Sequence, residues 1–420
     1  MNNKRGYIAS ICSGIGFFLM LLLLSLFASC SSDKDNDEGG GVQQEPTVLQ
    51  IYVFSPSNPI VTRANTGPVD AAYEKESIIS SLHIWVYPHN TDANYNSDVA
   101  LGCITLSPDE ITNFQNSGAG RYTMVVTDDF ANDPVNVDVY VLANVSGGEY
   151  GLPATLDENT KKSELQDAMI QKNSDSDDPF GVSAVTTVGA LSEDGLPMSG
   201  VLIDQPVVGN PPILRIGTAQ QVATARLTRA VSKMRFVFCQ ASDMENQVKI
   251  TGVTLAAAQI PNQEHLFLKQ AYDGRTCNIP DVASYNDAAF SLPNMNIDYG
   301  GLPPVDDPSK YSYNVQEGQD YEDLINTGIN ASPKELVEKG PFYFRESNKQ
   351  LTGTIYYTLK SGTTTEDKYT TFTMSAPGDF SRNHTWIVYA SYSASLLDVL
   401  SVEVVDWSKE YPKDWEFYNW

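Results

Sequence analysis

The chain has 420 residues, of which 27 are Lys or Arg and 52 are Asp or Glu, giving a formal net charge of −25 at pH 7. A chain this acidic cannot neutralise a phosphate backbone, which excludes nucleic acid as a partner. Hydrophobic residues make up 41% of the sequence, and the length allows two or three domains that each bury a core.

The first thirty residues have the pattern of an export signal. Lys4 and Arg5 precede a long apolar run, which ends in LFASC at residues 26–30 and resembles a bacterial lipobox. The resemblance implies that residues 1–29 are a lipoprotein signal peptide. It also implies that Cys30 becomes the mature N-terminus and carries a fatty acid such as palmitate. The length of the apolar run also permits an uncleaved membrane-spanning anchor.

The segment after Cys30, SSDKDNDEGGG, is acidic and glycine-rich and predicts a flexible tether. It also resembles the acidic signal that sends some bacterial lipoproteins to the outer face of the outer membrane, although a plain solvated spacer would have the same composition. Next comes PTVLQIYVF, in which Leu49, Ile51 and Val53 occupy alternate positions. This alternation predicts a strand with one apolar face.

Alternation with a period of two is the main signal in the rest of the chain. It occurs in LHIWVY at 82–87 and VNVDVYV at 135–141, and again in KMRFVF, GTIYYTL, YTTFTM, TWIVYASY and LSVEVV. Each run predicts a half-buried strand, so that in 135–141 the valines share one face while Asp138 and Tyr140 lie on the other. Clusters of Gly, Pro, Asn and Asp separate the runs, a pattern typical of antiparallel sandwiches.

Helices are predicted only as short additions to loops. One begins at Ser163 in SELQDAMIQK. A second covers SPKELVEKG, where Ser332 caps the start and Gly340 ends the helix.

The expected fold class is therefore mainly β, with two antiparallel β-sandwich domains and short decorating helices. A proline-rich stretch near residues 205–226 separates two series of strands. We expect the domains at 64–225 and 226–420, after a segment at 30–63 that combines the tether with the first strand.

No pattern of catalytic or cofactor chemistry is recognisable. The four histidines lack metal-ligand spacing, and a nucleophile elbow, a phosphate-binding loop and a dinucleotide fingerprint are all missing. Asp175, Asp177 and Asp178 could bind calcium, but they lack the glycine and the final glutamate of an EF-hand and favour a solvated acidic loop. The sequence predicts a protein that is not an enzyme and has neither cofactor nor metal.

Five cysteines occur, two of them in the signal region. The other three, Cys103, Cys239 and Cys277, are an odd set with apolar or mixed neighbours, so we interpret them as small core residues or free thiols.

Several stretches, taken in order, resemble the bacterial fimbrillin family, the major subunits of type V pili. These stretches are ESIISSLHIWVY (76–87), VDVYVLAN (137–144), LPMSG (196–200), LTRAVSKMRFVF (227–238), FSRNHTWIVYASY (380–392) and the Trp-rich ending at 402–420. The resemblance implies transthyretin-like sandwich domains, a place in a fimbrium at the outer membrane and cell surface, and a role in adhesion.

The resemblance further implies that a trypsin-like protease cuts the exported lipoprotein after an arginine. Arg63 is the matching position, and a cut before Ala64 would release the strand that carries Leu49, Ile51 and Val53. The vacated groove could accept a strand from the next subunit, so the partners would be further copies and accessory subunits.

The expected donor is the C-terminal segment from about Leu400 to Trp420. Its alternating apolar residues and its large anchors are Leu400, Val402, Val404, Trp407, Trp415 and Trp420. The alternative is that 399–407 is simply the last strand of its own domain.

Two other functions stay open at this stage. The chain could be an accessory fimbrial subunit, either a basal anchor that keeps its lipid uncut or a tip protein. It could also be a lipid-anchored surface module that binds glycans. The aromatic cluster that would then stack on sugar rings is Trp407, Trp415, Phe417, Tyr418 and Trp420.

Overall fold

The computed structural model describes residues 46–55, 76, 78–171, 195–242, 247–256, 259–269, 278–281, 284–285, 289–305, 337–374, 382–393 and 396–406. All of them lie in the second of two compact units, Pro46–Trp420, the first unit being Met1–Glu45. This part of the chain is mainly β, as the sequence predicted. None of its helices is both long and apolar enough to cross a membrane.

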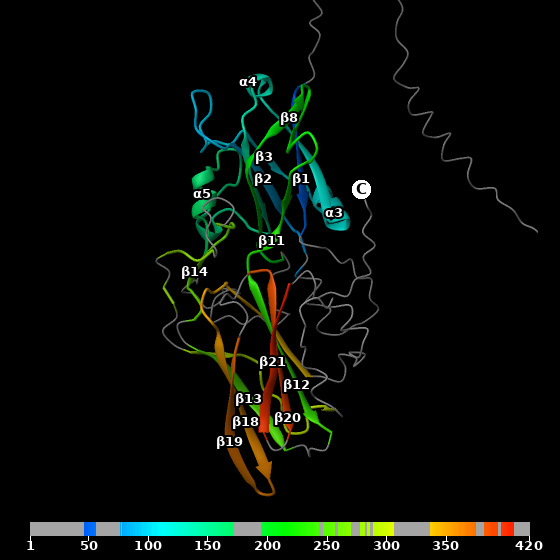
Figure 1. The fold of residues 1–420 in the computed structure, drawn as a ribbon, viewed down its shortest axis with the longest axis vertical. Coiled ribbons are helices and arrows are strands. Elements are labelled where there is room, and N and C mark those ends of the chain that lie inside the picture. The colour runs from blue at the N-terminus through cyan, green and yellow to red at the C-terminus, as the bar shows by residue number, and fades with distance from the viewer. Residues whose placement is uncertain are drawn as a thin grey trace, which may run out of the picture. The chain divides into compact units, whose positions relative to one another are not determined.

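The strands of the first half of the chain form two large sheets (Figure 1). Their bounds are β1 (Val48–Phe54), β2 (Leu82–Pro88), β3 (Gly102–Thr105), β4 (Ala119–Val125), β5 (Val137–Ala143), β7 (Met198–Gln205), β8 (Val207–Asn210), β9 (Ile213–Ile216), β10 (Thr224–Arg226) and β11 (Thr228–Arg229). One sheet contains β10, β1, β9 and β8, with β4 paired to β1, and the other has the order β11-β7-β5-β2-β3.

The inner faces of these two sheets share one buried hydrophobic cluster. Its members run from Leu49 to Val231, and Leu266, Phe267 and Tyr343 join from later segments of the chain. The two sheets therefore pack face to face around a common core, in the manner of a sandwich.

The prediction of half-buried strands is wrong for β5, in which every residue is buried. Helix α5 (Lys162–Asp167) supplies Lys162, whose Nζ lies 3.0 Å from Asp138 Oδ2. The Nε2 of Gln166 donates to Tyr140 Oη at 2.8 Å, and the ring of Phe267 packs edge-on against Tyr140. The face that the sequence assigned to solvent is thus covered by a helix and a loop that come later in the chain.

A second pair of sheets is formed by the later strands (Figure 1). Their bounds are β12 (Ser232–Ala241), β13 (Val248–Leu255), β15 (Phe290–Leu292), β16 (Pro304–Val305), β17 (Val337–Phe344), β18 (Thr352–Ser361), β19 (Thr364–Thr373), β20 (His384–Ser393) and β21 (Leu396–Asp406). One sheet has the order β16-β12-β20-β21, with β17 also paired to β12, and the other is β15-β13-β18-β19. The short strands β6 (Met169–Gln171) and β14 (Gln263–His265) pair with each other.

Both sheets of this second pair contribute to a separate buried cluster. It begins at Met234 and ends at Leu397, and it includes stacked and edge-on contacts of Phe236 with Phe238, Phe342 and Phe372. The division between the two clusters therefore falls between Val231 and Met234. The domain limits at 225 and 226 stay a prediction.

The helix predicted to begin at Ser163 exists but is short. It is α5, which begins at Lys162 and ends at Asp167. At its start, the Lys161 N–H donates to Glu164 Oε2 at 2.8 Å. The strand β6 begins two residues after its end, at Met169. The helix predicted to end at Gly340 is wrong over residues 337–340, which belong to β17 and pair with β12. Gly340 has φ +104° and lies beside a register shift in that pairing. The glycine is therefore part of a β-bulge and does not end a helix.

Two further helices are α3 (Pro108–Ser117) and α4 (Asp128–Asn132). Ser107 precedes α3, and both its N–H and its hydroxyl donate to Glu110 Oε2, at 2.8 and 2.7 Å. These hydrogen bonds lower the pKa of the Glu110 carboxyl. Gly118 ends the helix with φ +68°.

Candidate functional site

Strand β1 lies inside its sheet rather than at an edge. Along its whole length it pairs antiparallel with β4. On the other edge, residues 48–50 pair parallel with β9 and residues 52–54 pair parallel with β10. We call the space between β4 and the β9–β10 edge, which β1 fills, the β1 slot. Without a strand in this slot, two backbone edges would lose their hydrogen-bond partners.

The inward face of β1 is fully enclosed. Leu49, Ile51 and Val53 are 0%, 1% and 0% exposed and belong to the first buried cluster. Burial of three such side chains contributes roughly 5–9 kcal/mol. Across β4, Ile51 has Tyr122 as its register partner and Val53 has Gly120. Burial raises the pKa of Tyr122 to about 12, so this wall of the slot stays uncharged.

The outward face of β1 is neutral but has arginines on both sides. Gln50 pairs with Arg215 of β9, Tyr52 with Arg121 of β4, and Phe54 with Arg226 of β10. Arg121 and Arg226 are exposed and Arg215 is half-buried. Within the described residues none of the three forms an ion pair.

Two of these arginines have weak local contacts. The guanidinium of Arg226 lies 5.5 Å from the centre of the Phe54 ring, and Arg215 Nη2 donates to the carbonyl of Ala219 at 3.2 Å. Neither contact neutralises charge, so the outer rim of the β1 slot is basic in a chain whose net charge is −25.

The chain is held again at Glu76. Its buried carboxylate has Lys233 Nζ at 3.0 Å from Oε2 and accepts from Tyr343 Oη at 2.5 Å. The Nε of Arg229 donates to the Glu76 carbonyl at 3.0 Å. β1 and Glu76 stand on opposite sides of Arg63 in the sequence. A cut after Arg63 would therefore separate β1 covalently from a residue that is itself firmly held.

Several predicted residues lie outside the described part of the chain. They are Cys30, Arg63, Ala64, Asp175, Asp177, Asp178, Cys277, Trp407, Trp415, Phe417, Tyr418 and Trp420. Their predicted roles as lipidation site, processing site, acidic loop, thiol and aromatic anchors stay predictions.

The predicted donor residues Leu400, Val402 and Val404 lie in β21. Val402 pairs with Val388 and Val404 with Trp386 of β20, while Leu400 falls at a register shift. β21 stands last in the order β16-β12-β20-β21, so β20 is its neighbour on one edge only among the described strands.

Cys103, Cys239 and His83 have structural surroundings that account for their presence without a chemical role. Cys103 is a half-buried free thiol whose pKa burial raises to about 11, and Cys239 is a buried free thiol whose pKa is also raised by burial. His83 Nδ1 lies 3.0 Å from Thr105 Oγ1, and its ring stacks on Trp85. The described residues hold no cluster of three His, Cys, Asp or Glu side chains placed to bind a metal.

Sequence reasoning missed the three arginines of the slot rim. Arg215 and Arg226 follow the buried residues Leu214 and Ala225, and Arg121 precedes the half-buried Tyr122, so the outward direction of each arginine could have been inferred strand by strand. Their convergence could not, because it depends on which strands pair with β1.

No protein-family model and no curated protein matches the chain. Similar solved structures include one described as a "putative cell adhesion protein" from Bacteroides eggerthii, with TM-score 0.44 and 13% identity, covering 88% of this chain and 98% of that one. The tip fimbrial protein Mfa3 from Porphyromonas gingivalis, truncated at its C-terminus, has TM-score 0.38 and 13% identity, with coverage of 86% and 99%. A "putative adhesin" from Bacteroides ovatus has TM-score 0.36 and 10% identity, with coverage of 86% and 93%.

Each of these neighbours is described as an adhesion or fimbrial protein.

The enclosed face of β1 generates a first prediction. Ile51→Ala removes buried methyl groups from the core of the first pair of sheets, so the free energy of unfolding should fall by about 2–5 kcal/mol. Gln50→Ala, one residue away on the outward face, should change it by less than about 0.5 kcal/mol. Urea unfolding followed by tryptophan fluorescence measures both, and equal losses would mean that β1 is not packed as described.

Proposed function

We propose that this chain is the precursor of a cell-surface fimbrial subunit that serves adhesion. It is exported to the outer membrane as a lipoprotein through Cys30, cut after Arg63 by a trypsin-like protease, and polymerised by exchange of β-strands between subunits. The observation that supports this most is the place of β1, a strand N-terminal to the proposed cut that fills the middle of a sheet and buries Leu49, Ile51 and Val53.

Cutting changes the thermodynamics of the β1 slot without changing its contacts. Before the cut, β1 is held at the high effective concentration of a covalently linked segment, and afterwards it is a separate peptide that can be lost to dilution. An emptied slot exposes apolar side chains and two unpaired backbone edges, which form a template for an incoming strand. Glu76 keeps the rest of the chain in place.

The donor in this proposal is the C-terminal segment of another copy. Leu400, Val402 and Val404 match the size and spacing of the three residues that β1 buries. Among the described strands, β21 has β20 on one edge and no partner on the other, whereas a strand in the slot has partners on both edges. The donated strand thus gains a second row of backbone hydrogen bonds, while β20 loses the row that it shares with β21. Because slot and donor are different parts of the chain, the contact is head to tail and builds an open filament.

The arginine rim favours a donor with carboxylates facing outward. If Leu400, Val402 and Val404 take the inward positions, Glu403 occupies the place of Tyr52 and becomes the neighbour of Arg121. β1 offers only neutral residues there. The incoming strand then gains a charge-assisted pair that the outgoing strand lacks.

Proteolysis tests the processing step. Protein that begins at residue 31, treated with a trypsin-like protease, should acquire a new N-terminus at Ala64 and form ladders on unboiled gels. Arg63→Gln should abolish both results, while Lys75→Gln, a matched loss of a basic residue in the same segment, should behave as wild type. Cutting at Ala64 that yields only monomers would contradict polymerisation and favour an anchor, a tip protein or a glycan-binding module.

A disulfide lock tests the release of β1. Gln50 and Thr123 are register partners on the outward face, so Gln50→Cys with Thr123→Cys should tie β1 to β4. The oxidised protein should be cut but stay monomeric, and reductant should restore the ladders. A matched lock between β18 and β19, Thr354→Cys with Thr371→Cys, should leave assembly independent of reductant. Assembly of the oxidised β1–β4 lock would show that β1 need not leave.

A charge exchange tests the donor register. Arg121→Glu in the acceptor should slow assembly about threefold to tenfold at low salt, because an exposed ion pair is replaced by like charges. Glu403→Arg in the donor should restore the rate when mixed with Arg121→Glu, and should slow assembly with the wild-type acceptor. If wild-type protein assembles but the two changes show no coupling, the register at 400–404 is wrong and residues 407–420 become the candidate donor.

A further inference from the structure

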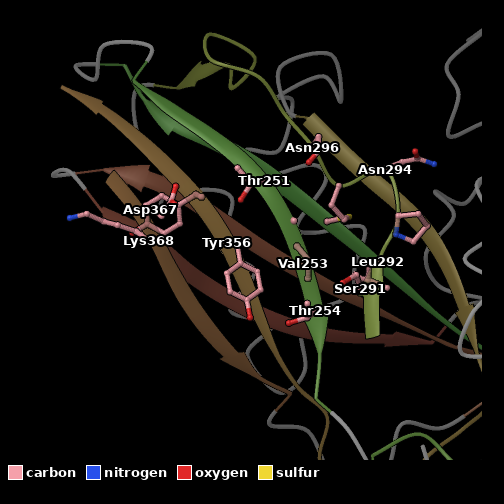
Figure 2. Close-up of a pocket in the computed structure, with 14 residues that line it drawn as sticks. Thr251, Val253, Thr254, Ser291, Leu292, Asn294, Asn296, Tyr356, Asp367 and Lys368 are labelled. Atoms are coloured by element: carbon pink, nitrogen blue, oxygen red, sulfur yellow. The ribbon is translucent and has the colours of Figure 1, made fainter. Parts of the chain in front are cut away.

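The outward face of the sheet β15-β13-β18-β19 carries a groove with an aromatic wall (Figure 2). Its lining includes Thr251 and Gly252 of β13, Tyr356 of β18 and the segment from Ser291 to Asn296. Figure 2 shows Tyr356 on one side of β13 and Ser291, Asn294 and Asn296 on the other. The strand β13 therefore forms a floor between an aromatic ring and a polar rim.

The floor is bare at Gly252. A Cβ added there would meet no atom within 4 Å, and the φ of this residue is not in the left-handed region. Gly252 is the register partner of Tyr356 and follows a bulge in β13. The missing side chain thus leaves open space directly beside a tyrosine ring that is 42% exposed.

A second tyrosine lies beside Tyr356 on the neighbouring strand, although it is not a lining residue of the groove. Tyr369 of β19 is the register partner of Tyr356 and is 69% exposed. Two exposed tyrosines opposite each other on adjacent strands present a broad ring surface to solvent, which is an uncommon use of large aromatic side chains.

The polar groups around the floor are neutral and unengaged. The side chains of Thr251, Thr254, Ser291, Asn294 and Asn296 form no hydrogen bond with other described residues. Together they offer hydroxyl and amide groups that can both donate and accept.

The charged groups at the edge of the groove are already engaged. Asp367 Oδ1 accepts from Thr358 Oγ1 at 3.1 Å, and Lys368 Nζ lies 3.4 Å from Glu366 Oε2. The groove therefore offers a ligand an aromatic ring and neutral polar groups, while the charges of Asp367 and Lys368 lie at one edge.

We propose that this groove binds a neutral saccharide. A pyranose ring has an apolar C–H face that can stack on the Tyr356 ring. Its equatorial hydroxyl groups can form hydrogen bonds with the amide and hydroxyl side chains around the groove. The bare backbone at Gly252 lets the sugar approach the sheet closely. Neither cutting at Arg63 nor strand exchange depends on this groove, so the inference stands apart from the assembly proposed above.

The test uses the chain from residue 31 onward and saturation-transfer NMR with a panel of disaccharides: maltose, cellobiose, lactose, chitobiose and mannobiose, with digalacturonate as the anionic member. At least one neutral disaccharide should receive saturation. Tyr356→Ala should weaken its binding about tenfold, equivalent to the loss of one aromatic contact. Tyr52→Ala, a half-buried tyrosine on the first sheet, should leave binding unchanged.

Gly252→Val provides a second variant that keeps every side chain of the groove. It fills the floor and should abolish binding, while circular dichroism and the urea midpoint report whether the fold is intact. Three results would each overturn the proposal: no saturation of any neutral disaccharide, binding that survives both Tyr356→Ala and Gly252→Val in folded protein, or binding of digalacturonate alone.

Discussion

The pairing of β1 on both edges is the constraint on which the rest of the first half of the chain depends. β4 comes from residues 119–125, whereas β9 and β10 come from residues 213–226, and among the described strands only β1 joins these two regions within the sheet. The sheet needs some strand in this position, because the edges on either side and the core beneath it are incomplete without one. The sheet does not, however, require that this strand belong to the same chain.

In the proposed pathway, this constraint makes one molecule stable before the cut after Arg63 and able to accept a new strand after it. As long as β1 is covalently attached, it satisfies the edges and shields the apolar floor, which suppresses untimely pairing with other chains. Repulsion between chains of net charge −25 acts in the same direction. The basic rim formed by Arg121, Arg215 and Arg226 is then a local exception that favours an acidic strand over random contact.

The second pair of sheets has a different character. Its core is closed by its own strands, from Met234 to Leu397. Its distinctive features lie outside that core, in the one-sided edge of β21 and in the tyrosines on the outward face of β18 and β19. In the two proposals, β21 is the donated strand and the tyrosine face of β18 binds the saccharide. The two activities therefore use different elements of this pair of sheets.

The sequence by itself determined the fold class and the positions of several of the longer strands, because alternation of apolar residues is a local property. It indicated that Leu49, Ile51 and Val53 share a face, and the burial of all three agrees with that. The capping signal of α3, Ser107 and Glu110 followed by Gly118, was also present in the sequence, although it was not recognised. Where local signals misled, as at Gly340, a strand partner more than a hundred residues away decided the outcome.

Only the tertiary structure decided what each strand has beside it. Local alternation places Asp138 and Tyr140 away from the valines, but whether that second face meets water depends on α5 and Phe267, which come from elsewhere in the chain. Likewise, three arginines from three strands form one rim only because β1 pairs with β4, β9 and β10 together. Pairing register is set by the burial of a whole face across a sheet, and no single stretch of sequence contains that information.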